Sequence, residues 1–544
     1  MKKKNIQLFL LILIFTAIIS ILIELTSQTS LYRDPWMFIH FNSSNYILEN
    51  KSFPSMELLK SESYVIKQSF FGIGGTASYP YPVMLISSLS ILSGLNIEFF
   101  INHSYFLLLI SGLVFFVLFR KLFASSELAL MLSVFVIFFP FEPLFHKITV
   151  HGWILGKIFG ALSLIFLVFI IKDFEEKKAG LFKVILNFFL ALYFSFLALL
   201  ADKSAFLMSL LPVMLFIIAY FFLNKKIHGQ KMKFSLWVYA FILIIFLLLI
   251  FSSVNLDEAT RGIVNRITLF HLKNLHFIPT FISSAIPYSE IYFTYDFSYQ
   301  IIRYVIPVLI VIILLLFTYK KIIKFISRNT IINSFILSQL FSSALIAAGF
   351  LLSLPYLSHR GAAILAWFFI LLCGISIATI KNKQAKIIVF LLFFFLVFLM
   401  PFYSYTQTLE YKYYRFNERQ VSSIHWAGKN TEKDANFYSD IKMSKAIASI
   451  AKKNAFNASY EFDDWASFEI LPIFYDQNIE SALIALKVYP IHYLVLTNDI
   501  AELNFWVANQ PLKPATGLQK YDESENFLKV FENGYVRIYK INYD

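Results

Sequence analysis

The sequence predicts a polytopic α-helical membrane protein with a small extracytoplasmic α/β domain at its C-terminal end. Of its 544 residues, 58% are hydrophobic and 18% aromatic, and the mean hydropathy is +0.67. This composition is too apolar for a soluble globular protein. The apolar character ends near residue 403, so we divide the chain into a membrane domain (1–403) and an outer domain (404–544).

About eleven apolar runs of spanning length predict the transmembrane helices, since a helix needs roughly 20 apolar residues to cross a bilayer. The runs are 6–25, 99–119, 123–141, 152–171, 181–201, 205–223, 234–254, 301–318, 331–354, 362–380 and 387–403. The run 6–25 follows Met1 and three lysines but precedes no small-x-small cleavage site. We therefore expect it to remain as the first helix and not to be removed as a signal peptide.

The distribution of basic residues predicts the orientation. Residues 1–403 carry a net charge of +16 and residues 404–544 a net charge of −3. Twenty Lys and Arg residues fall in one alternating set of short connections, which we place on the cytoplasmic side. The N-terminus is then cytoplasmic, and the outer domain is extracytoplasmic. The basic excess belongs to membrane topology, so we expect no nucleic-acid partner.

A long first outer loop (26–98) follows the first predicted helix. Near its end, Tyr79-Pro-Tyr-Pro82 introduces the short apolar segment 80–95, which ends at Ser93-Gly94. We expect this segment to form a helix against the outer surface. Counting it as a spanning helix would place Arg120 and Lys121 outside and reverse the charge pattern downstream.

The outer domain shows alternating helix and strand patterns. Residues 444–453 predict a helix and His492–Thr497 a buried strand. Residues 528–531 and 536–541 predict a hairpin, because Asn533-Gly534 between them supplies the positive φ angles of a tight turn.

Asp34 is the first candidate for chemistry, in Arg33-Asp34-Pro35-Trp36 just beyond the first helix. A carboxylate at a lipid–water boundary is costly and marks a functional position. The alternative is a helix N-cap, since Asp before Pro is a common helix start. Trp36 and His40 follow in the same loop and are candidates for substrate binding.

Three cationic or titratable side chains are candidates for binding a phosphate. Arg360, next to His359, offers a rigid fork of donors at a predicted outer turn, and Lys157 lies near the outer end of the fourth predicted helix. The alternative for Arg360 and Lys157 is snorkelling to the interface.

Three further side chains raise the question of a metal. Glu142, His146 and His151 lie in one predicted outer turn and, with Asp34, could hold a divalent cation such as Mg²⁺ or Mn²⁺. Isolated interfacial histidines are the alternative reading. The single cysteine, Cys373, excludes an intrachain disulfide and a Cys-cluster metal site. No phosphate-binding loop of the G-x-x-x-x-G-K-[ST] type is present, which argues against an ATP-driven pump.

The motifs resemble those of the GT-C superfamily of membrane glycosyltransferases. Asp34-Pro35-Trp36 is similar to the Asp-Pro-Trp of oligosaccharyltransferase first loops, and Tyr79–Pro82 to the Tyr-Pro element that closes them. The stretch His425–Ala435 resembles the entry to their outer domain, and Val530–Tyr539 their final hairpin. Protein O-mannosyltransferases and aminoarabinose transferases share this layout.

The resemblance implies an inverting transfer of a sugar from a polyprenyl-phosphate-linked donor. It implies that Asp34 is the general base, with a glycan, lipid or protein as acceptor. Two departures argue against modification of peptide sequons. Asp440–Lys445 stands where the Trp-Trp-Asp-Tyr-Gly signature is expected, and His151-Gly152-Trp153 replaces the Asp-x-Glu of the second outer loop.

Three other readings remain open from the sequence. A flippase or transporter of lipid-linked saccharides needs the same cationic clamp but no base, and inverted repeats would support it. A polysaccharide polymerase or ligase would use the long outer loop 255–303. A non-catalytic member of the superfamily would only bind partners.

Overall fold

The computed structural model describes residues 44, 48–49, 80–95, 106–123, 125–137, 152–175, 181–201, 212–220, 223, 306–327, 330–351, 368–400, 416–458, 471–488, 490–502, 505–507, 510–512 and 517–543. The chain forms two compact units. The first, here the membrane unit, comprises Met1–Ile21, Tyr105–Tyr288 and Phe297–Ser404. The second, the outer unit, comprises Leu22–Ser104, Ser289–Asp296 and Tyr405–Asp544. The outer unit thus joins the first outer loop with the outer domain.

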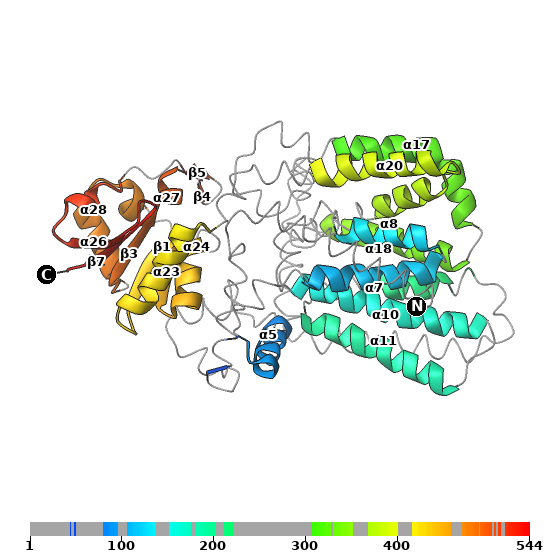
Figure 1. Cartoon of the computed structure of the whole chain (residues 1–544), viewed down its shortest axis with the longest axis horizontal. Coiled ribbons are helices and arrows are strands. Elements are labelled where there is room, and N and C mark those ends of the chain that lie inside the picture. Colours follow the sequence, from blue (N-terminus) through cyan, green and yellow to red (C-terminus); the bar gives the residue numbers. More distant parts are fainter. Residues whose placement is uncertain are drawn as a thin grey trace. The chain divides into compact units, whose positions relative to one another are not determined.

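The membrane unit consists of helices that lie side by side (Figure 1). Each falls on an apolar run predicted from the sequence. They are α7 (Phe106–Phe123), α8 (Ser126–Ile137), α10 (Gly152–Glu175), α11 (Leu181–Ala201), a helix over 212–220, α17 (Ile306–Ile326), α18 (Thr330–Leu351), the helix Phe368–Ala378 and α20 (Lys383–Phe394), which continues into the π-helix η4 (Phe395–Leu399). The runs 6–25 and 234–254 lie outside the described residues, and the predicted total of eleven helices stays a prediction.

Contacts between helix ends bring three of the basic connections, around 120–127, 172–183 and 381–386, to one end of the membrane unit. The Lys172 ammonium at the end of α10 donates to the Lys121 carbonyl at the end of α7. Lys183 at the start of α11 pairs with Asp173 at 2.6 Å. Lys386 at the start of α20 lies 3.5 Å from Glu127 at the start of α8. This is the clustering that the positive-inside pattern requires; which side of the membrane this end faces stays a prediction.

Two of the described helices are long and apolar enough to cross a bilayer, Leu155–Asp173 and Ile306–Ile326. Only 17% of the second span is buried within the protein. Apart from Lys320, Lys321 and Lys324 near its C-terminal end, its exposed side chains are large and apolar, including Leu316 (68% exposed) and Phe317 (84% exposed). Such a surface is suited to lipid and unsuited to water.

The helix predicted over 80–95 is present as α5 (Pro80–Ser93). Its Ile86, Ser87 and Ser90 side chains are buried, whereas Ile91 and Leu92 are exposed. Gly94, at φ +69°, terminates it, and its amide donates to the Ser90 carbonyl at 2.9 Å. The left-handed conformation that glycine adopts at low cost explains why the helix stops there.

A five-stranded mixed sheet forms the centre of the outer domain (Figure 1). Its strand order is β2-β1-β3-β7-β6. The strands are β1 (Asn436–Asp440), β2 (Asn454–Ala458), β3 (Tyr493–Thr497), β6 (Phe527–Glu532) and β7 (Val536–Ile541). Strands β1, β2 and β3 are parallel, and β7 runs antiparallel to both β3 and β6. A separate pair joins β4 (Phe505–Val507) and β5 (Gln510–Leu512).

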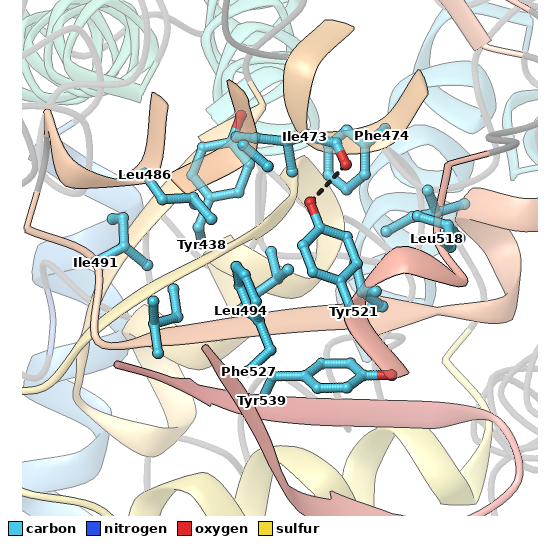
Figure 2. Close-up of a cluster of buried hydrophobic side chains, with 14 residues drawn as sticks. Tyr438, Ile473, Phe474, Leu486, Ile491, Leu494, Leu518, Tyr521, Phe527 and Tyr539 are labelled. Carbon is cyan, nitrogen blue, oxygen red and sulfur yellow. Dashed lines mark hydrogen bonds between the residues drawn. The ribbon is translucent and has the colours of Figure 1, made fainter. Parts of the chain in front are cut away.

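Helices cover both faces of this sheet. On one face lie the π-helix η6 (Leu471–Tyr475), α26 (Ile479–Lys487) and α28 (Lys520–Glu523), which enclose the cluster shown in Figure 2. There the Tyr521 hydroxyl donates to the Ile473 carbonyl at 2.6 Å. On the other face lie α23 (Glu418–Asn430), α24 (Ile441–Ala446) and the π-helix η5 (Ile447–Ala451). All five residues of β3 are therefore buried, as expected of a central strand.

The predicted elements of the outer domain are confirmed. The expected helix 444–453 is α24 followed by η5, the expected buried strand is β3, and the hairpin is β6–β7 with Gly534 at φ +76°. Strand β6 also contains a bulge between Lys529 and Phe531. Another helix, α27 (Asn498–Glu502), follows β3 directly.

Candidate functional site

Lys157 is the candidate phosphate ligand that the structure describes. It lies in the second turn of α10 and is half-buried, between the buried Gly156 and Ile158. It takes part in an interaction within the protein and is not a free cation. At 1.5 Å per residue, it lies about 22 Å along the helix from Lys172. Lys157 therefore lies toward the end of α10 opposite the basic loops, where the sequence predicts the outer membrane boundary.

The other predicted site residues lie outside the described residues. They are Asp34, Trp36, His40, Glu142, His146, His151, His359 and Arg360. Within the part of the chain that the structure describes, no three His, Cys, Asp or Glu side chains form a group that could hold a metal. The predicted roles of these residues, including the divalent cation, stay predictions.

The outer domain has one position where an α/β sheet commonly binds a ligand. The β1–β2 connection runs through α24 and η5 on one face of the sheet, and α26, which precedes β3, lies on the other. Strand order therefore reverses between β1 and β3, and the crevice outside the carboxyl ends of such strands is the usual ligand site. Asp440 ends β1 and Thr497 ends β3 at this point.

Buried charged and polar side chains lie just beyond the carboxyl ends of β1 and β3. The Lys442 ammonium donates to Asp499 Oδ2 at 2.8 Å and to Gln420 Oε1 at 3.2 Å. The Gln420 amide also donates to Asp499 Oδ2 at 2.8 Å, and the Tyr535 hydroxyl donates to Asp499 Oδ1. The Lys442 side chain is 0% exposed and that of Asp499 7% exposed. We call these four residues, Gln420, Lys442, Asp499 and Tyr535, the buried network.

The hydrogen bonds of the buried network connect α23, α24, α27 and the β6–β7 turn of the outer domain. Gln420 also accepts from the Asn417 amide at 3.0 Å, which completes a capping box at the start of α23. The segment Asp440–Lys445 therefore packs into the domain: Asp440 caps α24 through the Met443 amide at 3.0 Å, and Lys442 enters the network.

Sequence reasoning did not find the buried network. The pattern Asn417-x-x-Gln420 is a readable helix-start signal. The hydrogen-bond partners of Lys442, by contrast, lie 22 and 57 positions away along the chain, in α23 and α27. A single lysine after a strand reads as a solvated residue.

A second charged group lies at the start of β1. Glu432 accepts from the Tyr493 hydroxyl at 2.7 Å and from the Lys540 ammonium at 3.0 Å. These hydrogen bonds, that of Tyr493 first, lower the pKa of Glu432 to about 2. Its side chain is 54% exposed. An exposed, fully ionised carboxylate with two local partners is typical of a structural ion pair and not of a general acid.

No protein-family model and no curated protein matches the sequence. Solved structures do match. The archaeal oligosaccharyltransferase AglB from Archaeoglobus fulgidus, in complex with an inhibitory peptide and a dolichol-phosphate, superposes with a TM-score of 0.54 at 11% identity, over 100% of this chain and 75% of AglB. The same enzyme tethered to an acceptor peptide with the NVT sequon gives 0.55 at 13% identity, over 91% and 69%.

ArnT from Cupriavidus metallidurans in the apo state gives a TM-score of 0.51 at 10% identity, over 97% of both chains. At these identities the likeness concerns the fold, and it extends through both the membrane unit and the outer domain. The chain thus shares the fold of AglB and ArnT, two GT-C glycosyltransferases of the superfamily that its motifs resemble.

Proposed function

We propose that this protein transfers a sugar from a polyprenyl-phosphate-linked donor to an acceptor at the outer face of the membrane. Asp34 is the general base in this proposal, and Arg360, His359 and Lys157 hold the donor phosphate. Trp36 and His40 contact substrate. The observation that carries the proposal is a fold shared over nearly the whole chain with AglB, a structure of which contains dolichol-phosphate.

The reaction explains why these residue types are needed. The acceptor hydroxyl must lose its proton as it attacks the sugar carbon, and a positioned carboxylate is suited to accept it. The bond to the donor phosphate breaks at the same carbon, on the opposite side, and negative charge develops on the departing phosphate. An Arg fork and a Lys ammonium stabilise that charge.

The placement of Lys157 supports this assignment. The lysine lies within a helix of spanning length, half-buried, at the end away from the basic loops. A lysine in such a position is expected to face a polar cavity or an anionic partner. A lipid-linked phosphate at the membrane boundary is an anion of that kind.

A divalent cation belongs to the same proposal. Asp34, Glu142, His146 and His151 supply carboxylate and imidazole ligands, which suit Mg²⁺, Mn²⁺ or Zn²⁺. One AglB structure that shares the fold (TM-score 0.53) is a complex with Zn and sulfate. When bound, such an ion would neutralise the departing phosphate.

A glycan, a lipid or a protein without a sequon is the proposed acceptor. The segment Asp440–Lys445 stands where the resemblance expects the signature that recognises a peptide sequon. Its Lys442 is buried and bonded within the buried network. This supports an acceptor recognised elsewhere.

The test is transfer of radiolabelled sugar from polyprenyl-phosphate donors in purified membranes, by the unmodified protein and by Asp34→Asn. We expect the substitution to lower transfer by about 10²-fold or more, the size of a general-base contribution. Glu127→Gln, a carboxylate at the basic end of the membrane unit, is the matched control and should transfer normally.

Two outcomes would contradict the proposal, and one further arm tests the cation. Equal transfer by Asp34→Asn and the unmodified protein would contradict the base assignment. Transfer by neither, with labelled lipid still bound, would favour a flippase or a non-catalytic binder. The cation is tested by adding EDTA and then Mn²⁺. If the cation takes part, EDTA should abolish transfer and Mn²⁺ should restore it.

A further inference from the structure

The outer domain holds one non-glycine residue, Lys452, in the left-handed backbone region. Its φ and ψ are 55° and 42°, and no other described non-glycine residue has a positive φ. This conformation costs roughly 1–2 kcal/mol for an L-residue with a Cβ. Glycine is the usual residue at such a helix end, because it has no Cβ.

The neighbours of Lys452 fix its backbone on both sides. Ala451, the last residue of η5, packs so closely on α23 that a Cβ on Gly428 would lie 3.3 Å from the Ala451 Cα. Lys453 is buried, and its ammonium donates to the carbonyls of Thr431 and Glu432 at 2.9 and 2.8 Å. The chain on both sides of Lys452 is therefore tied to the domain, while the Lys452 side chain itself is 58% exposed.

That side chain forms an ion pair with Glu49 of the first outer loop. The two residues belong to the same compact unit, although 403 positions separate them in the sequence. Two described residues close to Glu49 in the sequence pack against the protein, since Ser44 is fully buried and Leu48 is half-buried. Glu49 is 56% exposed and Lys452 58% exposed, so the pair itself adds little stability.

We propose that Lys452 and Glu49 are positioning residues: through their ion pair the outer domain holds the first outer loop, which carries Asp34. The proposal rests on the proposed function, because Asp34 is the base there. The strained backbone of Lys452 and its exposed ion pair add little to the stability of the domain. A role in fixing the position of the loop carboxylate Glu49 explains them better. Loss of the pair should therefore lower turnover and leave the folding of the outer domain intact.

The contact between Glu49 and Lys452 is tested first by crosslinking, which does not depend on an activity assay. In a Cys373→Ser chain, which then has no cysteine, Glu49→Cys and Lys452→Cys are combined and treated in membranes with a short bismaleimide. We expect an intramolecular crosslink between the two positions. The control replaces Lys452→Cys by Lys487→Cys, an exposed lysine on α26 across the sheet, and should crosslink much less. Absence of the specific crosslink would overturn the proposal, whatever the transfer assay gives.

The positioning role is tested next by sugar transfer at saturating donor. Glu49→Gln and Lys452→Gly should lower turnover about five- to tenfold, the lower range of coupling between sites. The charge-exchanged double variant, Glu49→Lys with Lys452→Glu, should recover most of it. Lys452→Asn tolerates the left-handed backbone and should behave like Lys452→Gly, which separates the charge from the backbone.

The outcomes distinguish this inference from the proposed function. If the unmodified protein transfers sugar and these variants transfer equally well, the positioning role is wrong and the proposed function stands. If the unmodified protein transfers nothing, the proposed function fails, and the positioning role fails with it even when the crosslink forms.

Discussion

Because the Lys442 ammonium is buried, the stability of the outer domain depends on its ion pair with Asp499. The two side chains are 0% and 7% exposed. Lys442→Ala would leave the Asp499 carboxylate buried without its cation, at a cost of about 3–5 kcal/mol. Hydrogen exchange of the β1 and β3 peptides in the full-length protein measures this loss.

The matched control removes both charges. Lys442→Met combined with Asp499→Leu should recover most of the lost protection, because apolar residues of similar volume often replace a buried ion pair without net cost. A double variant as unstable as Lys442→Ala would show that the hydrogen bonds of Tyr535 and Gln420 to Asp499 matter more than the charges.

Lys520 gives the outer domain a pH dependence. It is 7% exposed and donates to the Asp476 carbonyl at 2.8 Å, and burial lowers the pKa of its ammonium to about 8 from an ordinary 10.5. Between these values the unfolded chain binds the proton that the folded chain has released. Stability should therefore rise as the pH increases from 8 to 10.5. Hydrogen exchange, corrected for the intrinsic pH dependence of the exchange rate, measures this stability. Lys520→Met should remove the rise in stability. An unchanged rise would show that another group causes it.

Among the elements, the β6–β7 hairpin depends on the backbone of its turn. Gly534 has φ +76°, and a Cβ added there would meet only Arg419, at an ordinary contact distance of 3.4 Å. Gly534→Val should destabilise the outer domain by about 1–2 kcal/mol through the backbone alone. Gly534→Asn should cost less, since Asn tolerates this conformation. Equal costs, measured by exchange of the β6 and β7 peptides, would indicate a steric cause.

The sequence predicts such elements well where the signal is local. Apolar runs located the described membrane helices, and Asn533-Gly534 located the hairpin. It does not predict the buried network or the left-handed Lys452, because these depend on packing between segments that are distant in the chain. Of the predicted site, Lys157 lies where the apolar run placed it, and the roles of the other residues still depend on experiment.

For the molecule as a whole, we expect exposed apolar side chains to contact lipid in the membrane unit and water in the outer unit. Leu316 on α17 is 68% exposed and Leu528 on β6 64% exposed. Leu316→Lys should cost about 2.5–3.5 kcal/mol if its surroundings are lipid, whereas Leu528→Lys should stay within about 0.5 kcal/mol. The amount of each variant that resists carbonate extraction measures the difference. Equal amounts would contradict the assignment of α17 to the bilayer.

The bulge between Lys529 and Phe531 should disfavour strand pairing between copies of the protein that meet in the plane of a membrane. Strand β6 is an edge of the sheet, and an edge strand offers unpaired amides and carbonyls to a neighbouring molecule. Here the ladder is interrupted, and Lys529 and Glu532 add charge to the same strand. Copies confined to two dimensions meet often, and this edge gives them no continuous template on which to aggregate.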